Sequence, residues 1–120
     1  MTVSDFINKN GLSSCLTSQN GSTMEFTPSD FSLLGYKIDK IKILCNRDSC
    51  IMHVYLYGNG LMQLGKALND YQFKMCELGF KCLVQSYSVN EITIYSIDPD
   101  SHVYDLEYQT GRSWNDLLGW

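Results

Sequence analysis

Residues 61–78 read LMQLGKALNDYQFKMCEL. Apolar side chains recur in this stretch at alternating spacings of three and four residues, at Leu61, Leu64, Leu68, Tyr71, Met75 and Leu78. This spacing places them along one side of an α-helix, so the stretch predicts an amphipathic helix that buries one face against another element. Gly79 is expected to act as a left-handed C-cap after the last turn.

Strand-like runs lie on both sides of this helix. Before it, residues 37–45 and 50–57 are predicted as two strands joined by a polar four-residue turn. After it, three more strands are predicted, at residues 82–89, 92–97 and 102–109. The body, residues 36–109, is therefore ββαβββ in an α+β fold: an antiparallel sheet of about five strands with one long helix packed on one face.

The first 35 residues are predicted to form a separate N-terminal segment that begins with a short helix. This helix is expected at residues 3–10, with Thr2 or Ser4 as its N-cap and Gly11 as its end. The segment precedes the sheet and provides further apolar side chains.

A weak hairpin and a second short helix are expected in the rest of that segment. Asn20-Gly21 predicts the turn of a hairpin within residues 13–27. Pro28 at a first helical position and Gly35 as a stop predict the second helix. At the other end of the chain, residues 110–120 are expected to form a terminal helical turn.

Strand alternation separates an apolar from a polar face in the first predicted hairpin. If Cys45 lies opposite Cys50, the apolar face carries Ile41, Ile43, Cys45, Cys50, Met52, Val54 and Leu56. The helix is expected to cover this face, which Leu83, Val89, Ile92 and Ile94 of the second hairpin extend. The other face carries Lys40, Lys42, His53, Tyr55 and Tyr57.

The second face is the candidate binding surface. Unless a bulge shifts the last strand, the tyrosines from three strands share it, and tyrosine-rich patches are enriched at protein interfaces. Two coverings stay open: the first 35 residues of the same chain, or a protein partner. The predicted protein-binding residues are Tyr55, Tyr57, Tyr95, Tyr104, Tyr108, Asp105 and Glu107.

Composition narrows the class of protein. A chain of 120 residues, 44% of them hydrophobic, is expected to form one domain at residues 1–120. The net charge of −4 repels phosphate backbones, so nucleic acid is not expected as a partner. The sequence has neither a run of about 18 apolar residues nor a secretion signal, which predicts a cytoplasmic protein without a membrane span.

Cysteine and histidine residues support an alternative, a metal- or cysteine-dependent enzyme domain. Cys45, Cys50 and His53 resemble a zinc-ligand cluster, but alternation points His53 away from Cys50. Five cysteines in a chain without an export signal are typical of reduced, mostly buried thiols. We therefore predict no metal, no cofactor and no catalytic residue.

The resulting prediction is a small non-enzymatic protein-binding module. Ala67 is the only alanine, and this composition is typical of AT-rich coding sequences such as many phages and viruses carry. We accordingly expect an inhibitor from a phage, virus or mobile element that docks on a host or toxin protein. A homo-oligomeric structural protein, dimeric through the same patch or a sheet edge, remains the other alternative.

Overall fold

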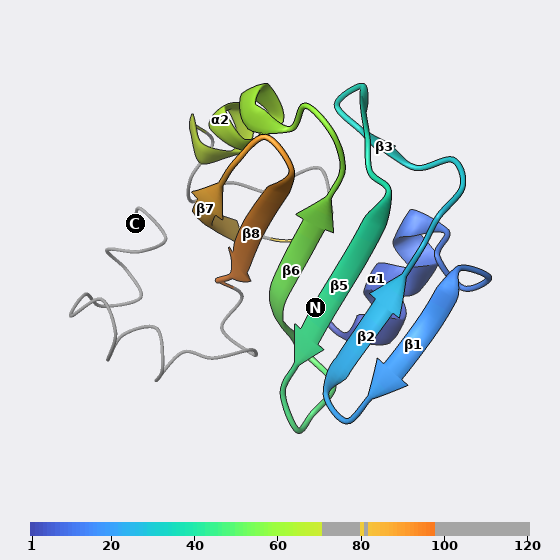
Figure 1. Ribbon diagram of the computed structural model, residues 1–120. Coiled ribbons are helices and arrows are strands. Elements are labelled where there is room, and N and C mark those ends of the chain that lie inside the picture. The colour runs from blue at the N-terminus through green and yellow to red at the C-terminus, as the bar shows by residue number, and fades with distance from the viewer. Residues whose placement is uncertain (71–79, 81, 98–120) are drawn as a thin grey trace.

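The structure, a computed structural model, describes residues 1–70, 80 and 82–97 (Figure 1). Within them the chain is α+β, with two helices and a six-stranded antiparallel sheet in the order β1-β2-β5-β6-β8-β7. The elements are α1 Val3–Asn10, β1 Leu16–Asn20, β2 Thr23–Phe26, β3 Ser32–Leu33, β4 Tyr36–Lys37, β5 Lys40–Cys45, β6 Ile51–Tyr57, α2 Met62–Asp70, β7 Cys82–Tyr87 and β8 Glu91–Ser96. The predicted class and antiparallel sheet are confirmed, although the number of strands is not.

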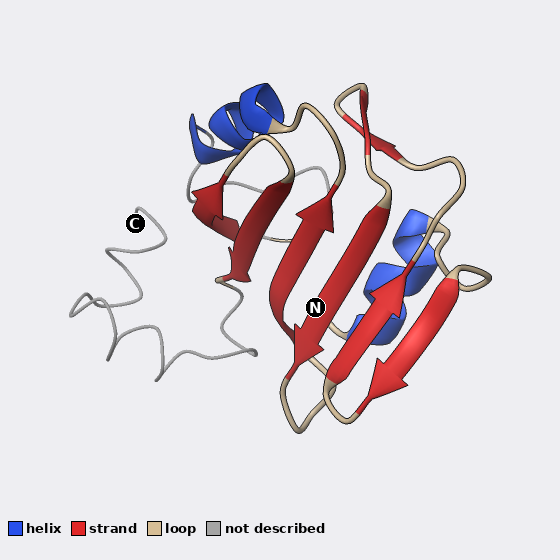
Figure 2. Cartoon of the chain, in the orientation of Figure 1, coloured by secondary structure: helices blue, strands red, loops and turns tan. Residues whose placement is uncertain are grey.

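The core lies on one face of the sheet. Ile41 and Ile43 of β5 pair with Leu56 and Val54 of β6, and all four side chains are fully buried. Both helices pack against this face, because their buried residues belong to the same hydrophobic cluster as the strands. In the view of Figure 2, α1 lies behind β2 and β5. The opposite face of the central strands is therefore on the side away from both helices.

Helix α1 has the predicted bounds and the predicted ends. Thr2 is its N-cap, and the Thr2 hydroxyl accepts a hydrogen bond from the backbone N–H of Asp5 at 3.1 Å. Gly11 ends the helix in the left-handed conformation, with φ of 66°. Phe6 on its buried face meets Phe80 edge to face, with ring centroids 6.1 Å apart, which fixes the helix against the core.

The N-terminal residues are bonded to the start of β6. The backbone N–H of Val3 donates to the carbonyl of Ser49 at 2.8 Å, and the N–H of Ile51 donates to the carbonyl of Met1 at 2.9 Å. Thr2 and Cys50 form the antiparallel bridge between these two bonds. The beginning of the chain thus runs beside a strand that is far away in the sequence.

The predicted weak hairpin is part of the main sheet. Its two-residue turn is Gly21-Ser22, one residue later than predicted, and Gly21 has a positive φ of 61° as the first central residue of a type II′ turn requires. Strand β2 pairs with β5, with Phe26 opposite Ile41. This pairing adds β1 and β2 to the sheet, which is why the sheet has more strands than expected.

The predicted second short helix is wrong. Residues 32–37 form the small β3–β4 hairpin instead, in which Leu33 pairs with Tyr36. Leu34 and Gly35 both have positive φ, 50° and 84°, which matches the type I′ turn that connects two strands tightly. The Leu34-Gly35 pair is therefore the centre of a β-turn and not the end of a helix. The stretch between Pro28 and Gly35 has too few residues to nucleate a stable helix on its own.

The predicted long helix is confirmed over its first half. Helix α2 covers Met62–Asp70, and Leu61, Leu64 and Leu68 of the stripe are buried in the core. The rest of the stripe, Tyr71, Met75 and Leu78, lies outside the described residues, as do Gly79, the predicted strand at residues 102–109 and the terminal turn at residues 110–120.

The turn between β5 and β6 lies where the sequence predicted it, but the register differs from the predicted one by one residue at Cys45 and by two residues from Lys40 to Leu44. The Asn46 side-chain oxygen accepts hydrogen bonds from the backbone N–H groups of Asp48 and Cys50, at 3.0 and 2.9 Å. Cys45 pairs with Ile51 and not with Cys50, because the ladder shifts next to Leu44. The bulge sends Ile51 into the core in place of Met52, which is only partly buried.

The predicted core face of the second hairpin is wrong for β7. Val84 pairs with Ile94 and is buried with it, whereas Leu83 pairs with Tyr95 on the other face. The turn is longer than predicted, since Tyr87 is already opposite Ile92, and the ladder shifts again between residues 84 and 86. Each change moves side chains to the opposite face of the strand.

None of the helices in the described part of the chain is long and apolar enough to span a bilayer. The predicted extent of one domain over residues 1–120, and the predicted cytoplasmic location, stay predictions.

Candidate functional site

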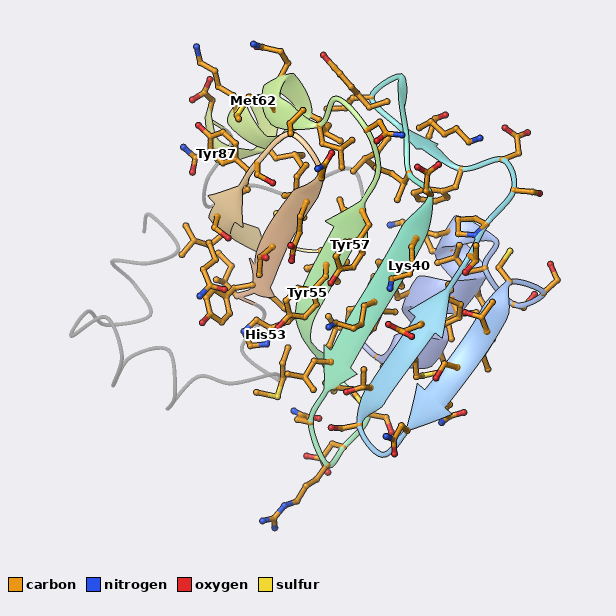
Figure 3. The ribbon with its side chains drawn as sticks, in the orientation of Figure 1. Lys40, His53, Tyr55, Tyr57, Met62 and Tyr87 are labelled. Atoms are coloured by element: carbon orange, nitrogen blue, oxygen red, sulfur yellow. The ribbon has the colours of Figure 1, made fainter. Side chains whose placement is uncertain are left out.

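Seven side chains on the central strands point away from both helices and form what we call the tyrosine face. They are Lys40, Lys42, His53, Tyr55, Tyr57, Glu91 and Tyr95. Figure 3 shows Lys40, Tyr55 and Tyr57 side by side over β5 and β6, with His53 at the far end of β6. Alternation explains the arrangement, since Val54 and Leu56, between the β6 members of the face, are buried in the core. All seven members are half-buried.

Two lysines lie over two tyrosine rings on this face. Lys40 is directly opposite Tyr57 and Lys42 directly opposite Tyr55 in the β5–β6 ladder. Their ammonium nitrogens are 4.8 and 4.6 Å from the respective ring centroids, within the range of a cation–π contact. Each exposed contact of this kind contributes roughly 0.5–1 kcal/mol. The lysine stems and the rings therefore form one continuous layer with charged ends.

His53 extends the aromatic layer toward β8. Its ring is stacked on Tyr55 at 6.0 Å between centroids and an interplanar angle of 21°. It also meets its cross-strand neighbour Tyr95 at 4.2 Å and 50°. His53 therefore joins two tyrosine rings at one end of the face, a type of cross-strand packing that stabilises a sheet surface.

Charges border the aromatic layer. The Lys40 ammonium is 3.3 Å from a carboxylate oxygen of Glu25, which β2 contributes to the same side of the sheet. On β8, Glu91 is directly opposite Tyr57. Burial raises the pKa of the Tyr57 hydroxyl above 10.0, and the carboxylates of Glu91 and Glu25 raise it further, whereas Lys40 lowers it. Tyr57 therefore stays a neutral phenol, able to donate a hydrogen bond, throughout the physiological range.

The structure brings three of the seven predicted binding residues together. Tyr55, Tyr57 and Tyr95 share the tyrosine face. The other four, Tyr104, Asp105, Glu107 and Tyr108, lie outside the described residues.

Sequence reasoning missed Glu25 and Glu91 as members of this surface or its border. The alternation of Glu25 with the buried Phe26 would have found the first, had β2 been assigned to the sheet. The pairing of Glu91 with Tyr57 required knowledge that β6 and β8 are neighbours, and no local signal gives that.

The alternative in which the first 35 residues cover this face is wrong. Val3, Phe6 and Leu12 pack in the core on the helix side of the sheet, together with Leu33. The remaining strands of the segment, β1 and β2, extend the sheet sideways. No element of the N-terminal segment that the structure describes lies across the tyrosine face.

The cysteines and histidine of the enzyme alternative are distributed over different environments. The Cys45 thiol donates to the carbonyl of Ser22 at 3.3 Å, and the Cys50 thiol approaches the carbonyl of Asp48 at 3.8 Å. Among the described residues, no three histidine, cysteine, aspartate or glutamate side chains are placed to hold a metal ion. Cys76 and His102 lie outside the described residues.

Comparison with known protein-family descriptions, curated proteins and solved structures finds no match to this chain. The functional interpretation therefore depends on the geometry of the tyrosine face.

Proposed function

We propose that this chain is a non-enzymatic protein-binding module that docks on a partner protein through the tyrosine face. The observation that carries the proposal is the continuous layer of Tyr55, Tyr57, His53 and Tyr95 on the side of the sheet away from both helices. Its finer form, an inhibitor from a phage, virus or mobile element that acts on a host or toxin protein, is supported by the alanine-poor composition.

The chemistry of this layer suits a protein partner. Tyrosine buries a large rigid ring at little cost in side-chain entropy, while its hydroxyl finds a polar partner, so it is enriched where interfaces are energetically strongest. The central rings are bordered by the charges of Lys40, Lys42, Glu25 and Glu91, which corresponds to the apolar centre and polar rim of a typical interface. The rings are already held by cross-strand contacts, so little ordering is needed on binding.

The test compares variants of the face with a matched tyrosine on the other side of the sheet. Tyr55→Ala and Tyr57→Ala each remove one ring of the face. Tyr87→Ala removes a ring that packs against Gly65 of α2 on the helix side. All three are checked for folding by circular dichroism before binding is measured.

The binding measurement uses a purified partner. A protein captured from lysate by the immobilised wild-type chain is identified by mass spectrometry, purified and titrated by calorimetry against each variant. We expect Tyr55→Ala and Tyr57→Ala to weaken binding at least tenfold, on the scale of about 1.4 kcal/mol, and Tyr87→Ala to bind like wild type. Equal affinities for the face variants and wild type would contradict the proposal.

A further inference from the structure

The residues of the tyrosine face, together with Leu44 and Thr93 on the same side of the sheet, are arranged in three rows across β5, β6 and β8. Residues directly opposite each other in an antiparallel ladder point to the same face, so the pairings define the rows. The first row is Lys40, Tyr57 and Glu91, the second is Lys42, Tyr55 and Thr93, and the third is Leu44, His53 and Tyr95. An aromatic ring on β6 is in the middle of every row.

The first row has opposite charges at its two ends. Lys40 is on β5 and Glu91 is on β8, with the neutral Tyr57 between them on β6. A twofold axis that lies between two facing sheets and runs parallel to β6 would exchange β5 with β8. It would place Lys40 of one copy opposite Glu91 of the other, twice, with the two Tyr57 rings in contact at the axis.

The other rows are compatible with the same axis. In the third row the axis would place Leu44 opposite Tyr95, which joins apolar surfaces, and His53 opposite its own copy. In the second row Lys42 would lie over Thr93, which is buried and uncharged, so the axis does not set Lys42 against another lysine. The face is thus complementary to itself under one symmetry operation, in both charge and polarity.

We infer that the tyrosine face binds a second copy of this chain, in a face-to-face dimer with its twofold axis along β6. This inference rests on the proposed function, because it names the partner of the same face. Two sheets pack face to face at about 10 Å with their strands aligned to within about 30°, which suits a shared axis along one strand.

The size of the face sets the expected strength of the dimer. About five strands overlap in this arrangement, and strands spaced by about 4.8 Å and about 20 Å long present roughly 500 Å² per copy. Twice this area is at the lower end of specific interfaces. We therefore expect a reversible dimer with a Kd in the micromolar range.

A charge-swap experiment tests the inference on the full chain. Lys40→Glu sets two carboxylates against each other at both contacts of the dimer, and Glu91→Lys sets two ammonium groups against each other. Each variant alone is expected to weaken dimerisation at least tenfold. In an equimolar mixture of the two variants, opposite charges meet at both contacts only in a dimer that contains one chain of each variant. The Lys40→Glu and Glu91→Lys chains are therefore expected to form a heterodimer more readily than either variant pairs with itself.

The heterodimer has one contact between the introduced carboxylate and the introduced ammonium group, and one between the native Lys40 and the native Glu91. Both contacts therefore join opposite charges, as in the wild-type dimer, and we expect the heterodimer to form with wild-type affinity. A defect confined to one chain would not be repaired by a second, different chain, so the mixture separates the inference from the local loss of the contact between Lys40 and Glu25.

The control is Lys9→Glu, which makes the same change in net charge as Lys40→Glu at an exposed position of α1, away from the tyrosine face. It is expected to dimerise like wild type.

The measurement is sedimentation velocity between 1 and 300 μM, in which the wild type should pass from 13.7 kDa to twice that mass. Three results would each overturn the inference: a wild-type chain that stays monomeric at 300 μM, single variants that dimerise like wild type, or a mixture of the two that stays monomeric. If the wild-type chain is monomeric but binds a different protein, and Tyr55→Ala loses that binding, the inferred dimer is overturned while the proposed function stands.

Discussion

Replacing Gly65 with alanine should destabilise the protein, although alanine is the better helix former. Gly65 is buried within α2, where the helix passes close to Tyr87 of β7. A Cβ atom at position 65 would lie 2.6 Å from Cγ and 2.7 Å from Cδ2 of Tyr87, and it would also overlap the Tyr87 Cβ. Because the tyrosine Cβ is fixed by the strand backbone, rotation of the ring cannot relieve the overlap.

Two opposing terms set the magnitude. Alanine in place of a helical glycine stabilises by about 1 kcal/mol. Overpacking at a site where the strand and helix must move apart costs up to about 3 kcal/mol. The net expectation for Gly65→Ala is a loss of about 2 kcal/mol in the free energy of unfolding, or about 8 °C in Tm for a chain of this length.

The assay is urea denaturation followed by circular dichroism, with Gln63→Ala on the exposed side of α2 as the control for helix propensity. Gln63→Ala should change stability by less than about 0.5 kcal/mol. In a Tyr87→Gly background, where the overlapping atoms are gone, Gly65→Ala should instead stabilise by about 1 kcal/mol. A Gly65→Ala protein as stable as wild type would refute the close approach of α2 to β7.

Three further predictions concern a cap, a turn and a titration. Thr2→Ala should cost about 1 kcal/mol of stability in urea denaturation because α1 loses its N-cap oxygen, whereas Thr2→Ser should retain most of it. Asn46→Ala should cost about 1–2 kcal/mol in the same assay, since two backbone N–H groups of the β5–β6 turn lose their acceptor, and no loss would contradict the turn geometry. The pKa of Tyr57 is raised in the folded chain, so its contribution to the free energy of unfolding is present below pH 10.0 and is lost as the pH rises through the folded-state pKa. The urea midpoint of unfolding, measured between about pH 9 and 11.5, should therefore fall more steeply with pH for wild type than for Tyr57→Phe.

The parts of the fold that local signals determine could be predicted. The apolar spacing of Leu61, Leu64 and Leu68 indicated the helix and its buried side, and the alternation around Val54 indicated both faces of β6. The polar stretch from Asn46 to Ser49 predicted the turn, because asparagine can bond its own following backbone. In each case the residues that set the structure are neighbours in sequence.

The errors came from register and from pairing between distant segments. The bulges next to Leu44 and after Val84 each shift a ladder by one residue, and no local sequence signal distinguishes a bulge from regular pairing. The pairing of β2 with β5 joins segments that are separated by the β3–β4 hairpin, so the strand number could not be predicted from either segment alone. The Leu34-Gly35 pair is compatible with a helix end and with a tight turn, and the tertiary context selected the turn.

The structure places three of the predicted binding residues, Tyr55, Tyr57 and Tyr95, on one face of the sheet, and the binding role of that face stays a prediction. Tyr55 and Tyr57 could be placed together because they are two residues apart on one strand. Lys40 and Glu91, the opposite charges on either side of Tyr57, are brought together by the strand order β5-β6-β8. Their placement could be predicted only if this order were known.

The backbone bonds from Val3 to Ser49 and from Ile51 to Met1 hold the first three residues beside Cys50, a residue that is only 6% exposed. We expect release of residues 1–3 to expose the Cys50 sulfur to an alkylating reagent such as iodoacetamide, because reactivity requires an accessible thiolate. The rate of Cys50 alkylation, measured by mass spectrometry of the peptide that contains it, is therefore expected to report how often residues 1–3 detach while the sheet stays intact.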